Sequence, residues 1–299
     1  MAAIKSVCVV GSGYMGYQIG LQCAYNGFPV WFYDISIEAL GLAIESIAGV
    51  LDGWVEEGKL TTKEKENIIT RIHTSDNMEE AVSDADLVIE AIPERLELKR
   101  EVFGQLDRKC REHTILATNS SSIRISRIED ATNRLDRVLN THFYSSPWRS
   151  SVVELMRGTA TSDETIERAR EFMKAIGMIP LTVLKESTGF IFNRVWRAIK
   201  RETLHLVDEG VASFEDVDRA WMCLYGSSIG PFGMMDRVGL DVVLDIERVY
   251  FEESEDEDDR PPAILLERVG RGDLGIKSGK GFYSYPDPAY CDPDWIRSG

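Results

Sequence analysis

Residues that build metal centres and disulfide frameworks are scarce in this sequence of 299 residues. It contains only four histidines, so we do not expect a histidine-rich metal site. The five cysteines are an odd number, widely spread and without a C-x-x-C pair, which argues against a disulfide framework and against thiolate zinc sites. They are Cys8, Cys23, Cys110, Cys223 and Cys291. We therefore expect no bound metal.

Long apolar runs are also missing. No stretch of about eighteen apolar residues occurs, so the sequence predicts no transmembrane helix. Residues 1–5 pass directly into an apolar, strand-like run, which leaves no room for a signal or transit peptide. A hydrophobic content of 43% is typical of a soluble globular protein, and 299 residues suffice for two domains. We therefore expect a cytoplasmic protein.

Positive charge is in deficit, because 34 lysines and arginines face 50 aspartates and glutamates and give a formal net charge of −16. This balance argues against nucleic acid and anionic membranes as partners. Part of the acidic excess lies in one run, residues 252–259. We interpret that run as a solvated acidic loop in preference to a docking site.

The first half of the chain alternates short apolar runs with helical patterns. The apolar runs predict strands at residues 5–10, 29–33, 85–91, 114–118 and 138–141. The helical patterns cover residues 14–26, much of 37–69, and 96–110. Continuously apolar strands separated by helices are typical of a parallel sheet covered on both faces. The sequence thus predicts a doubly wound α/β domain.

The pattern changes near residue 187. Beyond it the sequence is mostly helical, notably at residues 190–208 and 213–224, and no alternating strand pattern returns. We therefore predict a doubly wound domain over residues 1–187 and an all-helical domain over residues 188–299.

A glycine-rich loop follows the first predicted strand and opens the first predicted helix. It reads G-x-G-x-x-G, with Gly11 for the tight turn, Gly13 for close backbone approach to a pyrophosphate, and Gly16 for close packing of helix and strand. The free N–H groups at the start of the helix favour phosphate binding. We expect the whole loop to bind a dinucleotide; its residues are Gly11, Ser12, Gly13, Tyr14, Met15 and Gly16.

An acidic residue ends the second predicted strand. Asp34 lies 18 residues beyond Gly16, where a carboxylate can accept hydrogen bonds from both ribose hydroxyls. The same carboxylate would repel the extra phosphate of NADP, and no arginine follows closely. The alternative is a turn aspartate without a ligand. With the glycine loop beside it, Asp34 predicts NAD as the cofactor.

Further motifs occur in order along nearly the whole chain. They are residues 86–94, Lys99, 119–122, 142–143, 152–154, 189–194, 230–232, 236–241 and 277–283. With these motifs the chain resembles the L-3-hydroxyacyl-CoA dehydrogenase family, whose members take part in fatty acid metabolism. The resemblance implies a Rossmann domain followed by a helical domain that forms a homodimer.

The resemblance also implies roles for individual residues. His142 matches the general base that takes the proton from the 3-hydroxyl group, and Glu154 matches its carboxylate partner. Ser121 and Asn193 match polar groups around the reacting oxygen. Cofactor-side positions are matched by Glu94, Lys99, Asn119, Ser121 and Lys277.

The chemistry of hydride transfer agrees with these roles. Removing a hydride from a carbinol carbon leaves a hydroxyl proton to be taken up, and a neutral imidazole with a pKa near 6.5 suits that task. His142 follows the predicted strand at 138–141, at the edge where α/β sheets bind ligands. A lone histidine is otherwise more often structural. Ser121 is alternatively a helix N-cap, and Asn193 a surface asparagine.

One segment departs from the family pattern. The family usually has an Asn-Pro pair three residues after its histidine, whereas this chain has Ser145 and Ser146, followed by Pro147. We expect Trp148 and Arg149 to add bulk and charge beside the reacting centre, and Arg149 to pair with a free carboxylate or to be a solvated surface residue. The departure resembles the diketoreductase-like branch of the family.

Three functions therefore stay open. The first is a 3-hydroxyacyl-CoA dehydrogenase, and the second is a relative acting on a free 3-hydroxy or 3-keto acid or ester. The third is a crystallin-like structural protein without turnover, against which the joint presence of Ser121, His142, Glu154 and Asn193 argues. In each case we expect a homodimer, because residues 224–240 are rich in apolar side chains that a small helical domain has limited area to bury.

Overall fold

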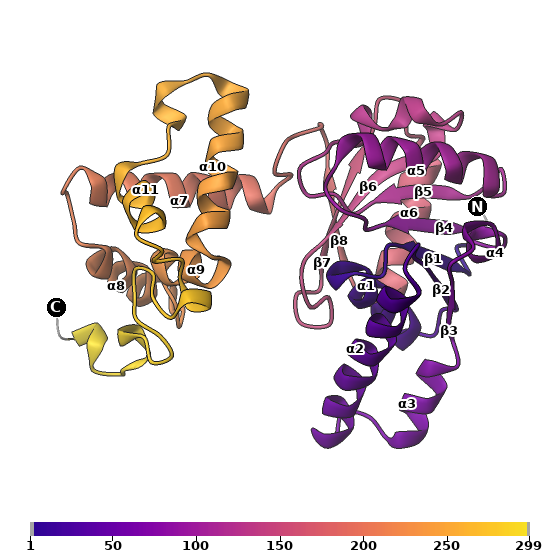
Figure 1. Cartoon of the computed structure of the whole chain (residues 1–299), viewed down its shortest axis with the longest axis horizontal. Helices are drawn as coiled ribbons and strands as arrows, with labels where there is room; N and C mark the ends of the chain where they lie inside the picture. Colours follow the sequence, from indigo (N-terminus) through magenta and orange to yellow (C-terminus); the bar gives the residue numbers. More distant parts are fainter. Residues whose placement is uncertain (1–2, 298–299) are drawn as a thin grey trace. The chain divides into compact units, whose positions relative to one another are not determined.

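The computed structural model describes residues 3–297 and divides the chain into two units, Met1–Ile191 and Phe192–Gly299. Figure 1 shows the first unit as a sheet with helices on both faces and the second unit as helices joined by loops. Every named strand of the described residues belongs to the first unit. The predicted fold class, a doubly wound sheet followed by an all-helical part, is confirmed.

The strands of the first unit form one eight-stranded sheet in the order β3-β2-β1-β4-β5-β6-β7-β8. They are β1 (Val7–Val10), β2 (Val30–Tyr33), β3 (Ile72–Ser75), β4 (Leu87–Glu90), β5 (Ile115–Thr118), β6 (Val138–Phe143), β7 (Val152–Arg157) and β8 (Ile179–Val183). All neighbours are parallel except β6 and β7, which are antiparallel. Strand order reverses between β1 and β4, the place where sheets of this class bind ligands at their carboxyl ends.

Helices cover both faces of this sheet. They are α1 (Tyr14–Tyr25), α2 (Ile37–Glu56), α3 (Thr62–Ile69), α4 (Met78–Val82), α5 (Leu96–Lys109) and α6 (Asp163–Ala175). Side-chain caps start several of them; Ser36, Thr61 and Ser162 accept hydrogen bonds from the first turns of α2, α3 and α6. One core lies beneath α1, α2 and α6, and the other lies beneath α4 and α5.

Alternate side chains of each central strand serve the two cores. In β1, Val7 and Val9 belong to the core beneath α1, while Cys8 and Val10 belong to the core beneath α5. Burying an aliphatic side chain of this kind stabilises the fold by about 1.5–3 kcal/mol. β1, β4 and β5, whose residues are all buried, are therefore apolar up to their last residues.

The predicted elements of the first unit are all present, with ends that differ by two residues or fewer. Three strands, β3, β7 and β8, and two helices, α4 and α6, are present but were not predicted from the sequence. Of these, β7 is the most consequential, because it carries Glu154.

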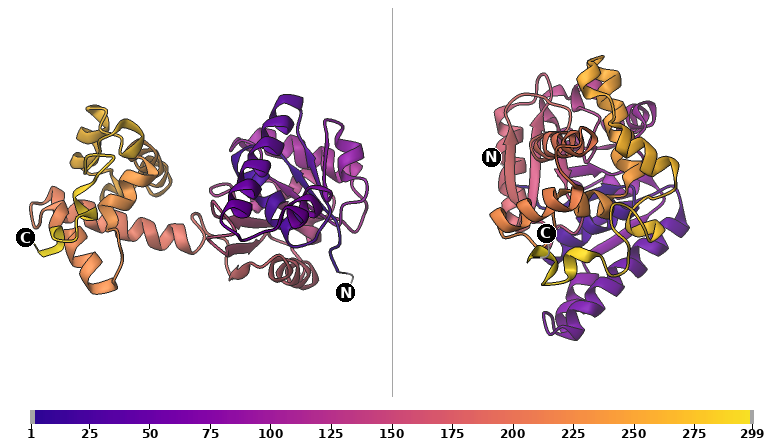
Figure 2. Two further views of the ribbon diagram at one scale, coloured as in Figure 1. Left: turned by 90° about the horizontal axis from the view of Figure 1, so that it is seen from below. Right: turned by 90° about the vertical axis from the view of Figure 1, so that its left-hand side faces the viewer.

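The second unit is built from helices α7 (Phe192–Asp208), α8 (Phe214–Tyr225), α9 (Pro231–Val238), α10 (Leu240–Ser254) and α11 (Ala263–Gly270). They pack around a core that includes Leu204, Phe232, Met235 and Leu265. Figure 2 shows the ribbon of these helices from two further sides. Phe232, Met235 and Leu240 are buried within the unit, whereas Leu224 and Tyr225 are exposed. None of the helices in residues 3–297 has both the length and the apolar composition needed to cross a membrane.

The acidic run at residues 252–259 is only partly the solvated loop that the sequence predicts. Its first residues extend α10, which ends at Ser254. At its other end Asp259 accepts hydrogen bonds from Arg197 and Arg201, both at 2.7 Å. Burial acts to raise the pKa of Asp259, but the hydrogen bonds from Ser254 and the two arginines outweigh it and hold the pKa below its ordinary value. Asp259 thus anchors the run to α7.

A buried carboxylate organises the middle of the second unit. Asp218 of α8 accepts hydrogen bonds from Phe232 N at 2.8 Å, Gly233 N at 3.0 Å and the hydroxyl of Tyr283 at 2.9 Å. Its side chain holds the first turn of α9, whose N–H groups have no partner within that helix. Burial raises the pKa of Asp218 from 3.8 to about 6, with a smaller contribution from Asp236.

This shift predicts a pH dependence of stability. Because the folded chain binds the Asp218 proton more tightly than the unfolded chain, the contribution to stability is present below the unfolded pKa and is lost as pH rises through about 6. Raising the pH from 5 to 7 should therefore lower the free energy of unfolding by about 1 kcal/mol through this residue. Urea unfolding midpoints measured across this range should fall less steeply for Asp218→Asn.

The matched control is Asp216→Asn on the same helix. Asp216 is exposed, and its hydrogen bonds with Ser213 and Arg219 lower its pKa, so its titration lies below this pH window. For Asp216→Asn, the fall of the urea unfolding midpoint between pH 5 and 7 should equal that of the unmodified chain. The prediction would be contradicted if the midpoint of Asp218→Asn fell as steeply with pH as that of the unmodified chain.

Candidate active site

Polar side chains gather at the carboxyl edge of the sheet because adjacent strands end in register. Val10 of β1 lies opposite Glu90 of β4, Glu90 lies opposite Thr118 of β5, and Thr118 lies opposite Asn140 of β6. His142 is two residues further along β6. These polar residues share the face covered by α5, since their strand neighbours belong to the opposite core.

The glycine loop has the shape that a pyrophosphate needs. Gly11 has φ +94°, and a Cβ there would lie 2.8 Å from Ala91 O. A Cβ on Gly16 would clash with the carbonyl of Gly11, whereas a Cβ on Gly13 would meet nothing within 4 Å. Helix α1 begins at Tyr14 without a side-chain cap, so its first N–H groups face the open space beside Gly13. The loop therefore fits the phosphates of a dinucleotide.

Asp34 lies immediately after β2 and folds against this loop. Its Oδ2 accepts hydrogen bonds from the Ser12 backbone N at 2.9 Å and from the Ser12 hydroxyl at 3.0 Å. Its Oδ1 accepts from Ser36 N at 3.0 Å. The carboxylate thus both fixes the loop and stands at the strand end where a ribose binds in this fold class.

A buried ion-pair network lies under the next strand end. Lys99 of α5 is 1% exposed, and its Nζ lies 2.7 Å from Glu90 Oε1 and 3.3 Å from both Glu94 Oε2 and Ile92 O. Thr118 donates a hydrogen bond of 2.6 Å to the other oxygen of Glu90. Lys99 therefore contacts protein oxygens on three sides and acts on Glu94, a predicted cofactor-side residue.

Glu94 is held by the serine-rich segment after β5. Its Oε1 accepts hydrogen bonds from the Ser122 hydroxyl at 2.6 Å, from Ser122 N at 3.0 Å, and from the Ser120 hydroxyl. Burial alone would raise the pKa of Glu94, but the Lys99 charge and these hydrogen bonds outweigh it and hold the pKa below its ordinary value. Glu94 is therefore a fixed, ionised acceptor.

Ser121 stands between the two serines that bind Glu94. Its side chain is exposed, and no hydrogen bond of its hydroxyl is found among residues 3–297. No helix begins at this segment, since the next one is a 3-10 helix at Ile125–Arg127; the Ser120 hydroxyl accepts the N–H of Ile123 at 2.8 Å within a turn. Asn119 uses its Oδ1 to accept Phe143 N at 2.9 Å, which ties the end of β5 to the end of β6.

The predicted acid–base pair is brought together by strand pairing. β6 and β7 place His142 directly opposite Glu154, and His142 Nδ1 lies 2.9 Å from Glu154 Oε2. The imidazole is 5% exposed and the carboxylate is fully buried. A buried carboxylate acts on a neighbouring charge much more strongly than one in water, so this arrangement suits a residue that gains and loses a proton.

Three groups around this pair were not expected from the sequence. The Tyr144 hydroxyl donates to Glu154 Oε2 at 2.8 Å, and the Ile191 N–H donates to Glu154 Oε1 at 2.9 Å. The ring of Phe190 lies 4.8 Å from the imidazole at an interplanar angle of 31°. Phe190 has φ +54°, a rare backbone conformation for a bulky residue, and the preceding Gly189 also has a positive φ. The sequence shows a phenylalanine after Gly189, but it does not predict the positive φ of Phe190.

The segment that departs from the family pattern is anchored to α1 and α2. The Ser145 hydroxyl lies 2.7 Å from the Tyr14 hydroxyl, and Ser146, with φ +56°, donates its N–H to Gln18 Oε1 at 2.6 Å. Both partners belong to the helix that follows the glycine loop.

Trp148 does not take the place expected from the sequence, whereas Arg149 is at the surface, the second of its two expected places. Trp148 packs edge-on against Trp54 of α2 at 5.4 Å, on the core face opposite His142. Arg149 is exposed and close enough to Glu57 to help lower the pKa of that carboxyl, after the larger effect of Lys59. The bulk of Trp148 is therefore placed against α2 and not beside His142.

The remaining predicted site residues belong to the second unit. Asn193 is the second residue of α7 and is half-buried. Lys277 lies in the turn after α11 and pairs with Asp241, with 2.5 Å between Nζ and Oδ2. The structure thus collects the predicted residues of the first unit at one sheet edge and places these two on the helical unit.

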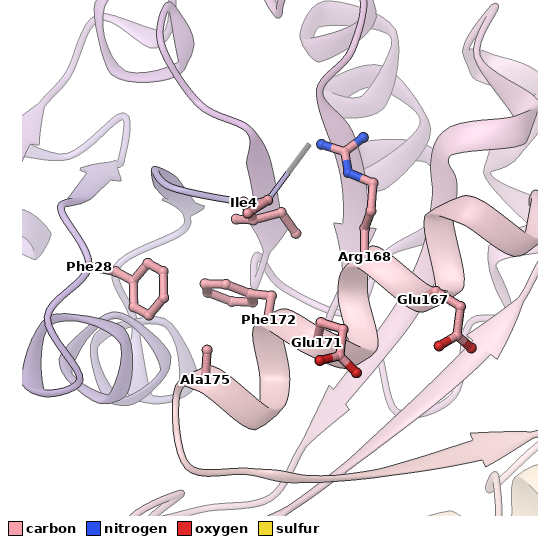
Figure 3. A pocket seen from close by; sticks show the side chains of 8 residues that line it. Ile4, Phe28, Glu167, Arg168, Glu171, Phe172 and Ala175 are labelled. Atoms are coloured by element: carbon pink, nitrogen blue, oxygen red, sulfur yellow. The ribbon is translucent and has the colours of Figure 1, made fainter. Parts of the chain in front are cut away.

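A separate hollow of about 670 Å³ lies at the opposite, amino edge of the sheet (Figure 3). Ile4, Phe28 and Phe172 form its apolar wall, and Glu167 and Glu171 stand at its margin. Phe28 and Phe172 contact each other edge-to-face at 5.0 Å. This hollow shares no residue with the glycine loop or with the His142–Glu154 pair.

The chain matches known families over most of its length. Residues 6–187 match the NAD binding domain of 3-hydroxyacyl-CoA dehydrogenase, and residues 189–285 match the C-terminal domain of the same family. A probable 3-hydroxybutyryl-CoA dehydrogenase of Bacillus subtilis is 38% identical over 284 residues, which cover 95% of this chain and 98% of the relative.

Solved structures agree. The (S)-3-hydroxybutyryl-CoA dehydrogenase of Ralstonia eutropha has a TM-score of 0.89 and 35% identity, over 95% of this chain and all of that chain (100%). A diketoreductase has a TM-score of 0.85 and 34% identity over the same shares, 95% and 100%. The chain belongs to the 3-hydroxyacyl-CoA dehydrogenase family of NAD-dependent oxidoreductases.

Proposed function

We propose that this chain interconverts a 3-hydroxyacyl-CoA and the corresponding 3-ketoacyl-CoA with NAD, and that His142 is the acid and base of the reaction. The observation that carries the proposal is the buried His142–Glu154 pair, joined at 2.9 Å, at the sheet edge that also bears the glycine loop. The Bacillus and Ralstonia relatives are named for 3-hydroxybutyryl-CoA, so a short acyl chain is the first substrate to test.

The hydrogen bond to Glu154 determines which ring nitrogen of His142 exchanges a proton with the substrate. A carboxylate accepts hydrogen bonds, so the hydrogen of the neutral ring resides on Nδ1, where Glu154 accepts it. The lone pair of Nε2 is then available for the proton of the substrate hydroxyl. As the ring becomes positively charged, Glu154 stabilises it, and in the reverse direction the ring returns the proton.

The residues proposed to bind NAD lie at the same carboxyl edge of the sheet. When bound, NAD accepts the hydride that leaves the carbinol carbon. The loop at residues 11–16 and the start of α1 would bind its pyrophosphate, Asp34 its adenosine ribose, and Glu94 its nicotinamide side. Lys99 would keep Glu94 in position, and Asn119 would keep the end of β6 in place. The carboxylate of Asp34 favours NAD over NADP by repelling a ribose phosphate.

The proposed roles of three other residues rest on the family motifs. Ser121, exposed beside Glu94, would donate a hydrogen bond at the reacting oxygen. Asn193 on α7 would be the second polar group there. Lys277 would contribute from the helical unit to the cofactor side. We also propose that residues 188–299 act as the substrate and dimerisation domain, and that the protein works in the cytoplasm in fatty acid metabolism.

Removing the imidazole tests the acid–base proposal. His142→Gln should lower kcat for acetoacetyl-CoA reduction by about 10² or more, because general acid–base catalysis contributes that much. NADH affinity, measured by fluorescence titration, should change little. Glu154→Gln should also lower kcat, since it removes the charge beside the ring.

The matched control is His113→Gln. His113 lies at the amino edge of the sheet, where its Nε2 is 3.1 Å from Asp86, and its removal should leave kcat unchanged. If His142→Gln kept turnover close to that of this control, His142 would be excluded as the acid–base residue.

A free 3-keto acid or ester is the second candidate substrate. It is favoured by the serine pair at residues 145–146 and by the similarity to a diketoreductase. The exposure of Arg149 weakens one argument for this candidate, because a solvated guanidinium is the alternative to one that pairs with a substrate carboxylate. The two substrate classes share the same hydride and proton steps.

Comparing the two substrate classes decides between them. We expect kcat/KM for acetoacetyl-CoA to exceed that for acetoacetate and its ethyl ester by about tenfold or more, which corresponds to about 1.4 kcal/mol of transition-state binding. Brisk reduction of a free keto compound without turnover of the CoA ester would reverse the assignment. No turnover of either class would favour the crystallin-like alternative.

The helical unit carries an exposed apolar stripe that fits a homodimer. Val242, Ile246 and Val249 of α10 are 38–45% exposed, and their spacing places them on one face of the helix. Light scattering at micromolar concentration should give the mass of a dimer, and Ile246→Asp should weaken it by placing a charge in the interface. Leu184→Asp, at an exposed site of the first unit, is the control; a monomeric unmodified chain would refute the dimer.

A further inference from the structure

Two neighbouring side chains, those of His142 and Tyr144, donate hydrogen bonds to Glu154 Oε2. One comes from His142 Nδ1 at 2.9 Å and the other from the Tyr144 hydroxyl at 2.8 Å. Tyr144 follows β6 directly, and its ring lies 4.7 Å from the imidazole at an interplanar angle of 60°. Tyr144 therefore touches both members of the pair, once through its ring and once through its hydroxyl.

We propose that Tyr144 is a positioning residue whose hydroxyl shares Glu154 Oε2 with His142 and so limits how strongly Glu154 holds the protonated imidazole. This inference rests on the proposed role of His142 as the acid and base. It adds that the Tyr144 hydroxyl helps to set the pH range in which His142 exchanges the substrate proton.

The physical reason is the sharing of one acceptor atom. A hydrogen bond to a carboxylate oxygen draws on the negative charge that would otherwise stabilise the neighbouring imidazolium. The effect is strong here because Glu154 is fully buried and His142 is 5% exposed, so water screens the charge of the pair very little. The Tyr144 bond is present whether His142 is neutral or protonated, so it weakens the preference of the pair for the protonated ring.

The hydroxyl stays a donor throughout the working pH range. Burial raises the pKa of Tyr144 far above its ordinary value, and the hydrogen bond to Glu154 and the charge of that carboxylate raise it further. The phenol therefore neither ionises nor accepts the substrate proton. It acts through Glu154.

Groups from the neighbouring segments also surround the His142–Glu154 pair. Ile191 donates its backbone N–H to the other oxygen of Glu154, and Phe190 lies over the second face of the imidazole. In the neighbouring strand β8, Leu181 lies opposite Glu154. Two charged groups on the same side of the sheet are engaged elsewhere, Glu186 with Ser126 N and Glu129 with Thr159.

Tyr144→Phe isolates the hydroxyl, because it keeps the ring against His142 and removes one atom. Oxidation of 3-hydroxybutyryl-CoA needs neutral His142, and the variant holds the protonated ring more tightly. The acidic limb of the kcat/KM profile should therefore move to higher pH by about 0.5–1 unit. The alkaline limb of acetoacetyl-CoA reduction should move in the same direction. KM for NAD should not change.

Two matched variants accompany it. Tyr25→Phe removes a hydroxyl from an exposed tyrosine of α1 that contacts Trp54, and its pH profile should superimpose on that of the unmodified chain. Replacing Tyr144 with a fluorinated tyrosine keeps the shape and makes the phenol a stronger donor. Its acidic limb should move to lower pH, opposite to that of Tyr144→Phe.

The outcomes separate this proposal from the one on which it rests. If the His142→Gln variant kept the kcat of the unmodified chain, His142 would not be the acid–base residue, and Tyr144 could not act through it. An inactive His142→Gln variant together with an unshifted or oppositely shifted Tyr144→Phe profile would overturn the Tyr144 proposal alone. If Tyr144→Phe fails to fold, the fluorinated variant decides, and an unshifted profile there overturns the proposal.

Discussion

The antiparallel pairing of β6 with β7 is the constraint on which this site depends. Because alternate residues of a strand face opposite sides, the observed register sets His142 and Glu154 side by side on one face. A slip of one residue would turn Glu154 into the core that Val153 and Leu155 now fill, with no partner for its charge. An unpaired buried carboxylate is strongly destabilising, so folding and chemistry require the same register.

The same reasoning extends along the sheet edge. β4 and β5 are apolar until their last residues, Glu90 and Thr118, whereas β6 becomes polar in its middle, at Asn140, which lies opposite Thr118. Each of these buried groups also bonds to a segment that follows a strand: Glu90 accepts the N–H of Ile92, Thr118 accepts that of Ser120, and Asn140 binds Ile125 N and Ile123 O. The polar contacts thus fix the loops that bear the site, and the apolar cores fix the strands.

How far the sequence predicts the site can be followed strand by strand. Apolar runs and the glycine loop were sufficient for β1, β4 and β5, and hence for the predicted nucleotide edge. β7 escaped notice because a buried glutamate interrupts its apolar pattern, and β8 because it contains Pro180, which is tolerated at the edge of a sheet. The residues alone placed His142 at the edge, but only the family resemblance paired it with Glu154. Trp148 was misplaced because an aromatic residue after a catalytic motif carries no sign of which face it packs on.

The loop between β6 and β7 links the two halves of the site. Its first residues contact the Glu154 carboxylate through Tyr144 and the helix of the nucleotide loop through Ser145 and Ser146. The usual Asn-Pro pair would lack the Ser146 N–H that now binds Gln18, because proline has no backbone donor. A substitution at this loop therefore acts on the acid–base pair and on the pyrophosphate helix together. Differences in substrate among relatives with this loop need not arise from side chains that touch the substrate, since a shift of α1 relative to β6 changes the distance between the hydride acceptor and the base.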